Sequence, residues 1–332
     1  MRAGGRALTG AAKKARLLRA FVKGEPVHCT WQLSPRCESF CHFCEHRAES
    51  AADELDAGAW GEVAAELGRR VSLLVSFTGS EPFLRGDLGP VVAAAARWHF
   101  PLLVTNGWLV APSRAREVWE AGLEAATVAL EDAEPDRHDA AVGQPGAHAR
   151  ALRALETLGA ERTRRSQRVN VRTRLRGADL GPLERVLGLA SRQGATVTVE
   201  AAYPLPTLNG DAPAVVAGLR ALKSRHPHLR TGGLALEAMG RAVSGGVPGC
   251  LAGRAFFNVD HRGRVSKCVE FRGPGDRVGE LPGGGAARLL PGLRAVAERN
   301  DCQACWYASR AEVESLYTVR GFLAGLRTLV AG

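Results

Sequence analysis

The sequence predicts an α/β fold, a partial (β/α)6 barrel of the TIM type followed by a small C-terminal domain. The first observation is that short strand-like runs alternate with longer helix-like patterns, which is typical of parallel βαβ units. The second is the length of 332 residues, which favours one large domain plus a small one. In such barrels the active site lies at the carboxyl ends of the strands.

Six strands and five helices are expected within the barrel. The strand-like runs cover residues 28–34, 71–77, 101–105, 124–130, 168–174 and 195–200. The helical patterns lie near residues 52–69, 89–98, 112–121, 146–159 and 180–193. Each motif described below falls at the end of one of these strands, so the motifs coincide with the edge where an active site is expected.

Other segments flank and follow the barrel. The pattern over 9–23 predicts a basic amphipathic helix that either caps the barrel or docks on a membrane surface or a partner. A helical patch at 212–225 lies within a linker rich in Pro and Gly, and 255–268 reads as a hairpin in the second domain. The expected divisions are an N-terminal helix (1–27), the barrel (28–205), a linker (206–247), a second domain (248–310) and a C-terminal helix (311–332) that packs back on the barrel.

Composition narrows the class of protein. The formal charge is +10, but only five of the 44 basic residues are lysine; this bias runs through the whole chain, and no nucleic-acid partner is expected. No run of 18 apolar residues and no apolar signal core occurs, so neither a transmembrane segment nor a secretion signal is predicted. Eight cysteines grouped as metal-site patterns favour a reducing compartment, and the cytoplasm is the predicted location.

The most informative stretch contains Cys37, Cys41 and Cys44. Three thiolates in eight residues can hold three corners of an iron–sulfur cube, which leaves the fourth iron open to a small chelating ligand. A zinc knot or a redox thiol pair is the alternative. The nearest histidines, His42 and His46, are poorly placed for a compact tetrahedral zinc site.

The C-x3-C-x2-C spacing, with the aromatic Phe43 before the last cysteine, resembles the signature of radical S-adenosylmethionine (radical SAM) enzymes. Residues 28–205 resemble this family, which implies six barrel strands rather than eight. Two positions differ from the family pattern, since Ser80 replaces a glycine and Glu131-Asp132 stands where Asp-Gly is commoner. The further stretches that carry the resemblance are Thr78-Gly79-Ser80-Glu81-Pro82, Val104-Thr105-Asn106-Gly107 and Val128-Ala129-Leu130-Glu131-Asp132.

The resemblance implies that a 4Fe–4S cluster on the three cysteines binds S-adenosylmethionine and that one electron cleaves it to a 5′-deoxyadenosyl radical. Glu81 is then expected to meet the ammonium group of the cofactor, and Glu131 its ribose. For Gly79 an ordinary βα turn is the alternative, and for Asn106 and Glu131 a capping or salt-bridge role. The expected cofactor-binding residues are Phe43, Gly79, Ser80, Glu81, Asn106 and Glu131.

Four more cysteines follow the barrel, Cys250, Cys268, Cys302 and Cys305. Their order resembles the auxiliary-cluster extension called SPASM or, in its shorter form, Twitch. One auxiliary 4Fe–4S cluster held by all four thiolates is the most they can bind, and a structural zinc site is the alternative. The eighth cysteine, Cys29, is interpreted as a buried core thiol.

Substrate-binding residues are harder to identify. Arg172 and Arg174 on the fifth strand, and Glu200 and Tyr203 near the sixth, are candidates to face the cavity, but strand-end salt bridges explain them equally well. No general acid or base is assigned.

The leading functional hypothesis is a radical SAM oxidoreductase or maturase that abstracts hydrogen from its substrate and then oxidises or crosslinks it. A flavodoxin or ferredoxin is the expected reductant. Peptides compete with small metabolites or lipids as substrates, and the 27 residues before the first strand leave little room for an N-terminal peptide-recognition domain. The alternatives are a redox-neutral radical SAM enzyme with a structural zinc module and a non-catalytic iron–sulfur electron carrier. Glu81 and the complete cysteine triad favour catalysis over the carrier.

Overall fold

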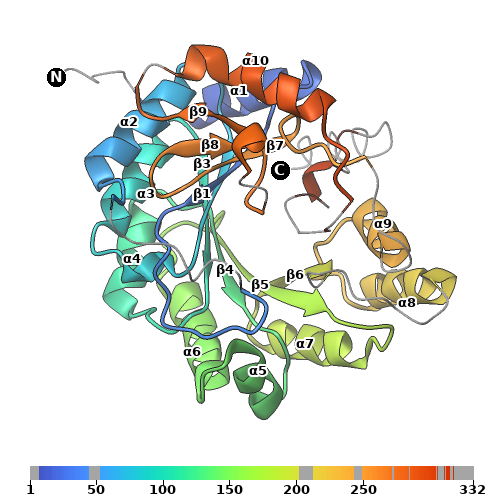
Figure 1. The fold of residues 1–332 in the computed structure, drawn as a ribbon. Coiled ribbons are helices and arrows are strands. Elements are labelled where there is room, and N and C mark those ends of the chain that lie inside the picture. The colour runs from blue at the N-terminus through green and yellow to red at the C-terminus, as the bar shows by residue number, and fades with distance from the viewer. Residues whose placement is uncertain are drawn as a thin grey trace.

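A computed structural model describes most of the chain as a partial barrel (Figure 1). The described residues are 7–44, 53–201, 212–242, 249–270, 273–283, 285–303, 305, 310, 312–314 and 317. Their strands are β1 (His28–Gln32), β2 (Leu74–Thr78), β3 (Phe100–Thr105), β4 (Ala125–Ala129), β5 (Arg168–Leu175), β6 (Thr196–Ala201), β7 (Phe256–Val259), β8 (Arg264–Ser266) and β9 (Arg277–Glu280).

The helices of the described residues follow the predicted alternation with a few additions. They are α1 (Gly10–Val22), α2 (Ala57–Gly68), α3 (Leu88–Ala96), α4 (Pro112–Glu120), α5 (Pro135–Val142), α6 (Ala147–Ala160), α7 (Gly181–Arg192), α8 (Ala212–Arg225), α9 (Gly233–Ala242) and α10 (Ala286–Glu298), with 3-10 turns η2 (Pro82–Leu84) and η3 (Pro274–Asp276). Helix α2 starts later than the predicted start near residue 52. The reason is that Asp56 caps the helix by accepting a hydrogen bond from the Ala59 amide at 2.8 Å.

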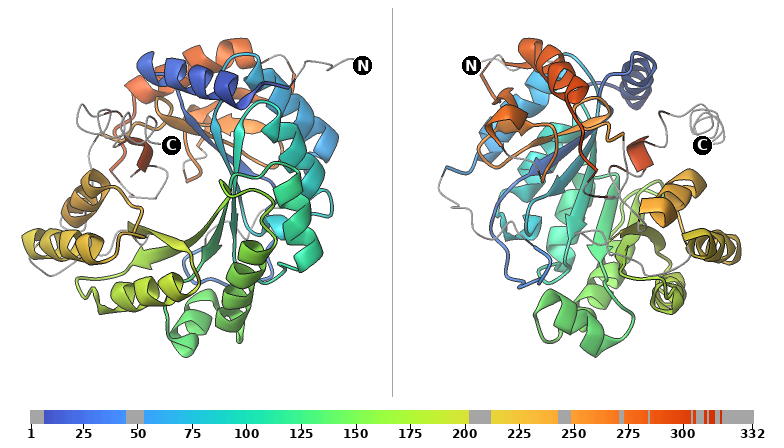
Figure 2. Two further views of the ribbon diagram at one scale, coloured as in Figure 1. Left: turned by 180° about the vertical axis from the view of Figure 1, so that it is seen from behind. Right: turned by 45° about the vertical axis from the view of Figure 1, so that its right-hand side comes forward.

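The six predicted barrel strands are confirmed, and they are all parallel in the order β6-β5-β4-β3-β2-β1. The sheet curves, with helices on its outer side. It does not close into a full barrel beyond β6 (Figures 1 and 2). The outer face is packed by apolar side chains, and the rings of Trp31 and Trp60 stack 4.8 Å apart between β1 and α2. This apolar layer fixes the strands, so their carboxyl ends form one rigid rim.

The second unit is joined to the barrel through the sheet. The predicted hairpin is present as β7 and β8, and Asp260 holds its turn by accepting hydrogen bonds from the Arg262 and Arg264 amides at 3.0 Å. β7 also pairs in parallel with β1, so β7, β8 and β9 extend the sheet to nine strands among the described residues. No sequence pattern indicates this pairing, because it joins residues more than 200 positions apart.

Three α-helices of the described residues were not predicted, namely α5, α9 and α10. α5 is short and polar and starts at a proline, which hides its periodicity. α9 lies inside the segment interpreted as a linker and packs on α8, where a Cβ on Gly240 would lie 2.1 Å from the Val216 Cγ2. The segment between the barrel and the second unit therefore contains a helical hairpin. The predicted C-terminal helix over 311–329 lies largely outside the described residues.

The N-terminal helix α1 caps the barrel. Thr9 accepts a hydrogen bond from the Ala12 amide at 3.2 Å, and the buried Lys13 ammonium donates to the carbonyls of Ala96 and His99 at 3.0 and 3.1 Å. These bonds tie α1 to the end of α3 and the start of β3. Within the described ranges, the structure contains no helix with the length and apolar character needed to cross a bilayer.

Candidate functional site

The three cysteines of the triad lie together at the mouth of the barrel. Cys37, Cys41 and Cys44 follow the carboxyl end of β1, and all three line a cavity of about 370 Å³ that extends into the barrel. This volume lies in the range of small-molecule sites. Burial raises the pKa of the Cys37 thiol to about 12 and that of Cys41 to about 11. These thiols therefore need a cation beside them to become the thiolates that ligate metal.

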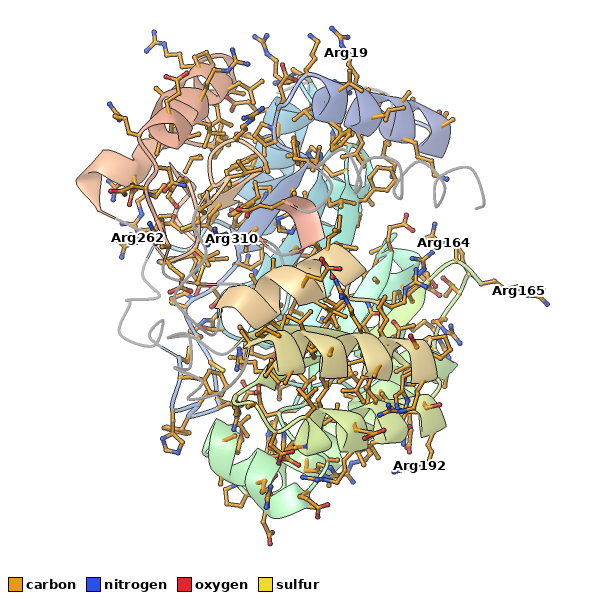
Figure 3. The ribbon with its side chains drawn as sticks, turned by 90° about the vertical axis from the view of Figure 1, so that its right-hand side faces the viewer. Arg19, Arg164, Arg165, Arg192, Arg262 and Arg310 are labelled. Carbon is orange, nitrogen blue, oxygen red and sulfur yellow. The ribbon has the colours of Figure 1, made fainter. Side chains whose placement is uncertain are left out.

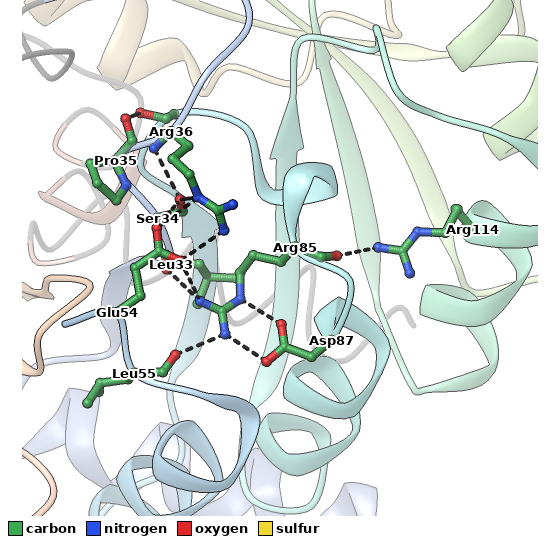
Figure 4. A network of polar contacts seen from close by, with 10 residues as sticks. Leu33, Ser34, Pro35, Arg36, Glu54, Leu55, Arg85, Asp87 and Arg114 are labelled. Atoms are coloured by element: carbon green, nitrogen blue, oxygen red, sulfur yellow. Dashed lines mark hydrogen bonds and ion pairs between the residues drawn. The ribbon is translucent and has the colours of Figure 1, made fainter. Parts of the chain in front are cut away.

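The start of the cysteine loop is anchored by a charged network around Arg85 (Figure 4). The buried Arg85 guanidinium donates to the Leu33 carbonyl at 3.0 Å and to the Leu55 carbonyl at 2.9 Å, and it pairs with Asp87 at 2.8 Å. Glu54 joins the same network by accepting from Ser34 at 2.7 Å. The network fixes where the chain leaves β1 and turns towards the triad.

The unpredicted helix α5 supports the rest of the loop. The Phe40 amide donates to the Val142 carbonyl at 2.9 Å, and the Ser39 hydroxyl donates to the Gln144 side chain at 2.8 Å. Gly143 approaches the loop so closely that a Cβ there would lie 2.6 Å from the Phe40 carbonyl oxygen. The end of α5 thus sets the height of the loop above the barrel.

Gly79 and Ser80 form a tight turn at the end of β2 and line the cavity. Both have a positive φ angle, 79° for Gly79 and 68° for Ser80. Residues other than glycine rarely adopt this backbone conformation. A Cβ on Gly79 would lie 2.5 Å from the Cβ of Gln32, so glycine is required there. The Ser80 hydroxyl donates to the Pro35 carbonyl at 2.8 Å and ties the turn to the cysteine loop.

Glu81 is fully buried and is absent from the cavity wall. Its carboxylate accepts hydrogen bonds from the amides of Phe83 at 2.9 Å and Asn106 at 2.8 Å, and from the Thr105 hydroxyl at 2.9 Å. Burial raises the pKa of Glu81 to about 7. In this structure Glu81 connects the ends of β2 and β3, whereas the sequence predicted a carboxylate that meets the cofactor.

Asn106 does face the cavity, at the end of β3. Its side-chain Nδ2 donates to Glu38 and to Ser39, both at 3.0 Å. Its side-chain Oδ1 accepts from the Trp108 backbone amide at 2.9 Å. Asn106 therefore links β3 to the cysteine loop while it stays exposed to the cavity.

Glu131 and Phe43 both line the cavity and share Arg174 as a partner. The Glu131 carboxylate accepts from Arg174 at 2.8 Å and from Arg176 at 2.9 Å, and the Arg174 guanidinium lies 3.9 Å from the centre of the Phe43 ring. The salt-bridge role that the sequence left open for Glu131 is thus present. Arg174 joins the cysteine loop to β5 through a cation–π contact.

The second set of cysteines also shares one cavity. It is lined by four cysteines from three segments of the chain, namely Cys250, Cys268 and the pair Cys302 and Cys305. The Asn300 amide donates to the Cys250 carbonyl at 2.8 Å, and the buried Arg310 guanidinium donates to the Cys305 carbonyl at 2.7 Å. Three residues line both this cavity and the triad cavity, namely Thr30, Val269 and Glu270. The two cysteine sites are therefore neighbours.

Both donor sets suit iron–sulfur chemistry, because each consists of cysteine thiols around a cavity with buried polar support. Across the described ranges, no three cysteine, histidine or carboxylate side chains are gathered tightly enough to hold a metal ion as they stand. The clusters on these residues therefore remain predictions.

The sequence missed some residues that shape the site. Thr105 lies in the motif Val104-Thr105-Asn106-Gly107, but its hydrogen bond to Glu81 depends on how β2 and β3 pair. Arg176 continues the alternation of arginines at 172, 174 and 176, a period-2 pattern that would have identified it. His138, on α5, lines the cavity and accepts from the Glu131 amide at 3.0 Å. Tyr203 lies outside the described residues.

A parallel barrel with a cysteine triad at the carboxyl end of its first strand defines a class of cluster-binding α/β proteins, and a family comparison identifies the class. Residues 31–173 match the model described as the Radical SAM superfamily. This part of the chain carries a radical SAM domain, which implies S-adenosylmethionine and a 4Fe–4S cluster as cofactors.

Curated relatives include a PqqA peptide cyclase from Methylocella silvestris, 34% identical over 128 residues, or 38% of this chain and 34% of the relative. A probable GTP 3′,8-cyclase from Aeropyrum pernix is 29% identical over 184 residues, or 52% of this chain and 50% of the relative. The matched parts thus span about a third to a half of these relatives, which are enzymes by name.

Solved structures share the fold over more of the chain. SuiB from Streptococcus suis bound to S-adenosylmethionine aligns with a TM-score of 0.61 and 13% identity, covering 79% of this chain and 65% of SuiB. The enzyme anSMEcpe with bound AdoMet and a peptide aligns with a TM-score of 0.64 and 14% identity, covering 82% and 83%. At these identities the comparison concerns the fold alone.

Proposed function

We propose that this chain is a radical SAM enzyme that abstracts hydrogen from a peptide and then oxidises or crosslinks it, with an auxiliary 4Fe–4S cluster in its C-terminal unit. The observation that carries the proposal is the triad cavity. It is lined by all three cysteines of the triad and by residues near the carboxyl ends of β2 to β6. A reacting group of the substrate can there lie close to a cofactor held at the rim.

Cys37, Cys41 and Cys44 would hold the first cluster, and their fit rests on three thiols on one cavity and on a loop fixed from both sides. When bound, the cluster and S-adenosylmethionine supply a 5′-deoxyadenosyl radical. The chain's own task is to position the cofactor and to exclude water. Gly79, Ser80 and Asn106 are placed to contact the cofactor, whereas Glu81 is proposed to act indirectly by fixing Asn106.

Peptide as the substrate class is supported by the relatives. One of them is named a PqqA peptide cyclase, and similar folds have been solved with a precursor peptide, in SuiB with SuiA, and with a peptide in anSMEcpe. We place peptide ahead of a lipid for this reason.

A small metabolite is the second candidate. The probable GTP 3′,8-cyclase matches a larger part of this chain than the peptide cyclase does, and an AdoMet-dependent heme synthase from Nitratidesulfovibrio vulgaris is 26% identical over 157 residues. A redox-neutral reaction with a zinc module belongs to the same alternative.

The C-terminal cysteines are proposed to hold the auxiliary cluster, which their common cavity beside the triad supports. A reducing partner such as flavodoxin or ferredoxin, and a cytoplasmic location, complete the proposal.

The test is to reconstitute the protein with iron and sulfide without oxygen and to assay 5′-deoxyadenosine under a strong reductant, with and without peptide pools. Formation of 5′-deoxyadenosine that peptides stimulate, together with peptides that lose hydrogen or gain a crosslink, supports the proposal. Reconstituted protein that holds the cluster but leaves S-adenosylmethionine intact contradicts the enzyme assignment. Cleavage that only nucleotides or tetrapyrroles stimulate selects the small-metabolite alternative.

A further inference from the structure

Five charged groups lie on or just after β4, β5 and β6, called here the β4–β6 charge cluster, and all of them except Arg176 line the cavity. These groups are Glu131, Arg172, Arg174, Arg176 and Glu200. Three guanidinium groups face two carboxylates, so the cluster has one positive charge in excess. This excess makes the β4–β6 side of the cavity suited to an anionic group.

The excess charge falls on Arg172. Arg174 is engaged on several sides, because it pairs with Glu131 at 2.8 Å, donates to Glu200 at 3.2 Å and covers the Phe43 ring. Among the described residues, Arg172 has a single ion pair, at 3.6 Å, to the same Glu200 oxygen that Arg174 already binds. The Arg172 Nε is buried and makes no hydrogen bond within the part of the chain that the structure describes, which is costly for a charged donor.

There is room for an acceptor beside Arg172. Its neighbours across the sheet are Ala129 on β4 and Thr198 on β6, both small, and all three residues line the cavity. Arg174, two residues closer to the rim, packs on the cysteine loop through Phe43. Arg172 therefore lies one layer deeper than the residues that hold the loop, on the part of the wall that a substrate entering the barrel would meet.

We propose that Arg172 is a specificity-determining residue that binds a carboxylate of the substrate. A guanidinium offers two parallel N–H donors that match a carboxylate, and the pairing satisfies the buried Nε. The inference rests on the proposed function for its substrate class, a peptide, and the carboxylate is either an acidic side chain or the peptide C-terminus.

The test uses three peptides on the reconstituted protein with saturating S-adenosylmethionine and no reductant. N-acetyl-Gly-Glu-Gly-amide carries only a side-chain carboxylate, N-acetyl-Gly-Gln-Gly with a free acid carries only a terminal one, and N-acetyl-Gly-Gln-Gly-amide carries none. Equilibrium dialysis with mass spectrometry measures each affinity. The variants are Arg172→Gln, Arg172→Lys and, as the matched control, Arg192→Gln, which removes an exposed arginine on the outside of the barrel (Figure 3).

We expect one carboxylate peptide to bind the wild-type protein and Arg192→Gln about 10-fold more tightly than the neutral peptide. Arg172→Gln should abolish this preference, and Arg172→Lys should keep part of it. Which of the two acidic peptides is preferred identifies the source of the carboxylate. A wild-type protein without preference, or a preference that survives in Arg172→Gln, overturns the inference.

The affinity for S-adenosylmethionine is measured in the same dialysis experiment. It distinguishes a role of Arg172 in binding the substrate from a role in binding the cofactor. It should be the same in Arg172→Gln and in Arg192→Gln. A selective fall in Arg172→Gln would assign Arg172 to the cofactor carboxylate and overturn the inference. The proposed function is tested independently, because cleavage of S-adenosylmethionine without a carboxylate preference refutes only the role of Arg172, and a preference without cleavage refutes only the enzyme.

Discussion

The two cysteine sites differ in how the chain builds them. The triad lies within eight residues, and its loop is held by polar contacts from β2, β3 and α5. The second set is drawn from separate segments around residues 250, 268 and 302–305, and buried side chains such as Arg310 position them. The difference indicates that spacing along the chain encodes the first site, whereas tertiary packing encodes the second.

The largest effect that tests this comparison is expected from replacing Cys37, Cys41 and Cys44 together by alanine. Because the thiols of the triad are the proposed ligands of the S-adenosylmethionine cluster, formation of 5′-deoxyadenosine should be abolished. The variant should keep about four irons of the about eight expected for two cubanes. Residual 5′-deoxyadenosine would mean that the triad is not the site of cleavage.

The reciprocal change, Cys302→Ala with Cys305→Ala, should remove the other four or so irons and leave cleavage of S-adenosylmethionine in place. It should also lower the thermal midpoint, because this site joins segments that are distant in sequence. Iron analysis and thermal unfolding measure the two effects. If the triple variant of the triad contains one zinc and no iron, the second site is a structural zinc module, and the redox-neutral alternative gains support.

The next largest effect is expected from a change at Glu81, because Glu81 holds Asn106, and Asn106 contacts the loop of the cysteine triad. Glu81→Ala would leave the buried amides of Phe83 and Asn106 without acceptors, at a cost of about 1–3 kcal/mol each in the free energy of unfolding. Affinity for S-adenosylmethionine should fall through the displacement of Asn106. Denaturant titration and equilibrium dialysis measure the two quantities, and an unchanged stability would contradict the connecting role of Glu81.

The pH dependence of stability follows from the raised pKa of Glu81. Its value rises from 4.5 to about 7 in the folded protein, so the folded state binds this proton more tightly than the unfolded state does. The resulting stability is complete below pH 4.5 and is lost as pH rises through 7, by about 3 kcal/mol. In Glu81→Gln this decline should be absent, so the difference between the two curves isolates it.

The smallest effect concerns the contact between the loop and β5. Phe43→Leu removes the cation–π contact with Arg174 and should lower the free energy of unfolding by about 0.5–1 kcal/mol. Phe40→Leu is the matched control, since the Phe40 side chain is 57% exposed, and it should change stability less. Equal losses in the two variants would show that the Arg174 contact contributes nothing measurable.

The sequence was sufficient to predict the barrel, because β-branched and apolar runs set its strands and the motifs mark their ends. It also identified Gly79 and Asn106, which line the cavity. It missed the pairing of β7 with β1, since hydrogen bonds between such distant segments leave no periodic signal. The burial of Glu81 was missed for a related reason, because its partner Thr105 becomes a neighbour only when β2 and β3 pair.

The pairing of β7 with β1 also bears on how the protein can be divided. A parallel barrel strand left at the margin of a sheet offers unpaired backbone groups on which a foreign chain can form a new strand. Here the hairpin of the C-terminal unit occupies that margin. Removing this unit would uncover β1, so a shortened chain is expected to self-associate through that strand.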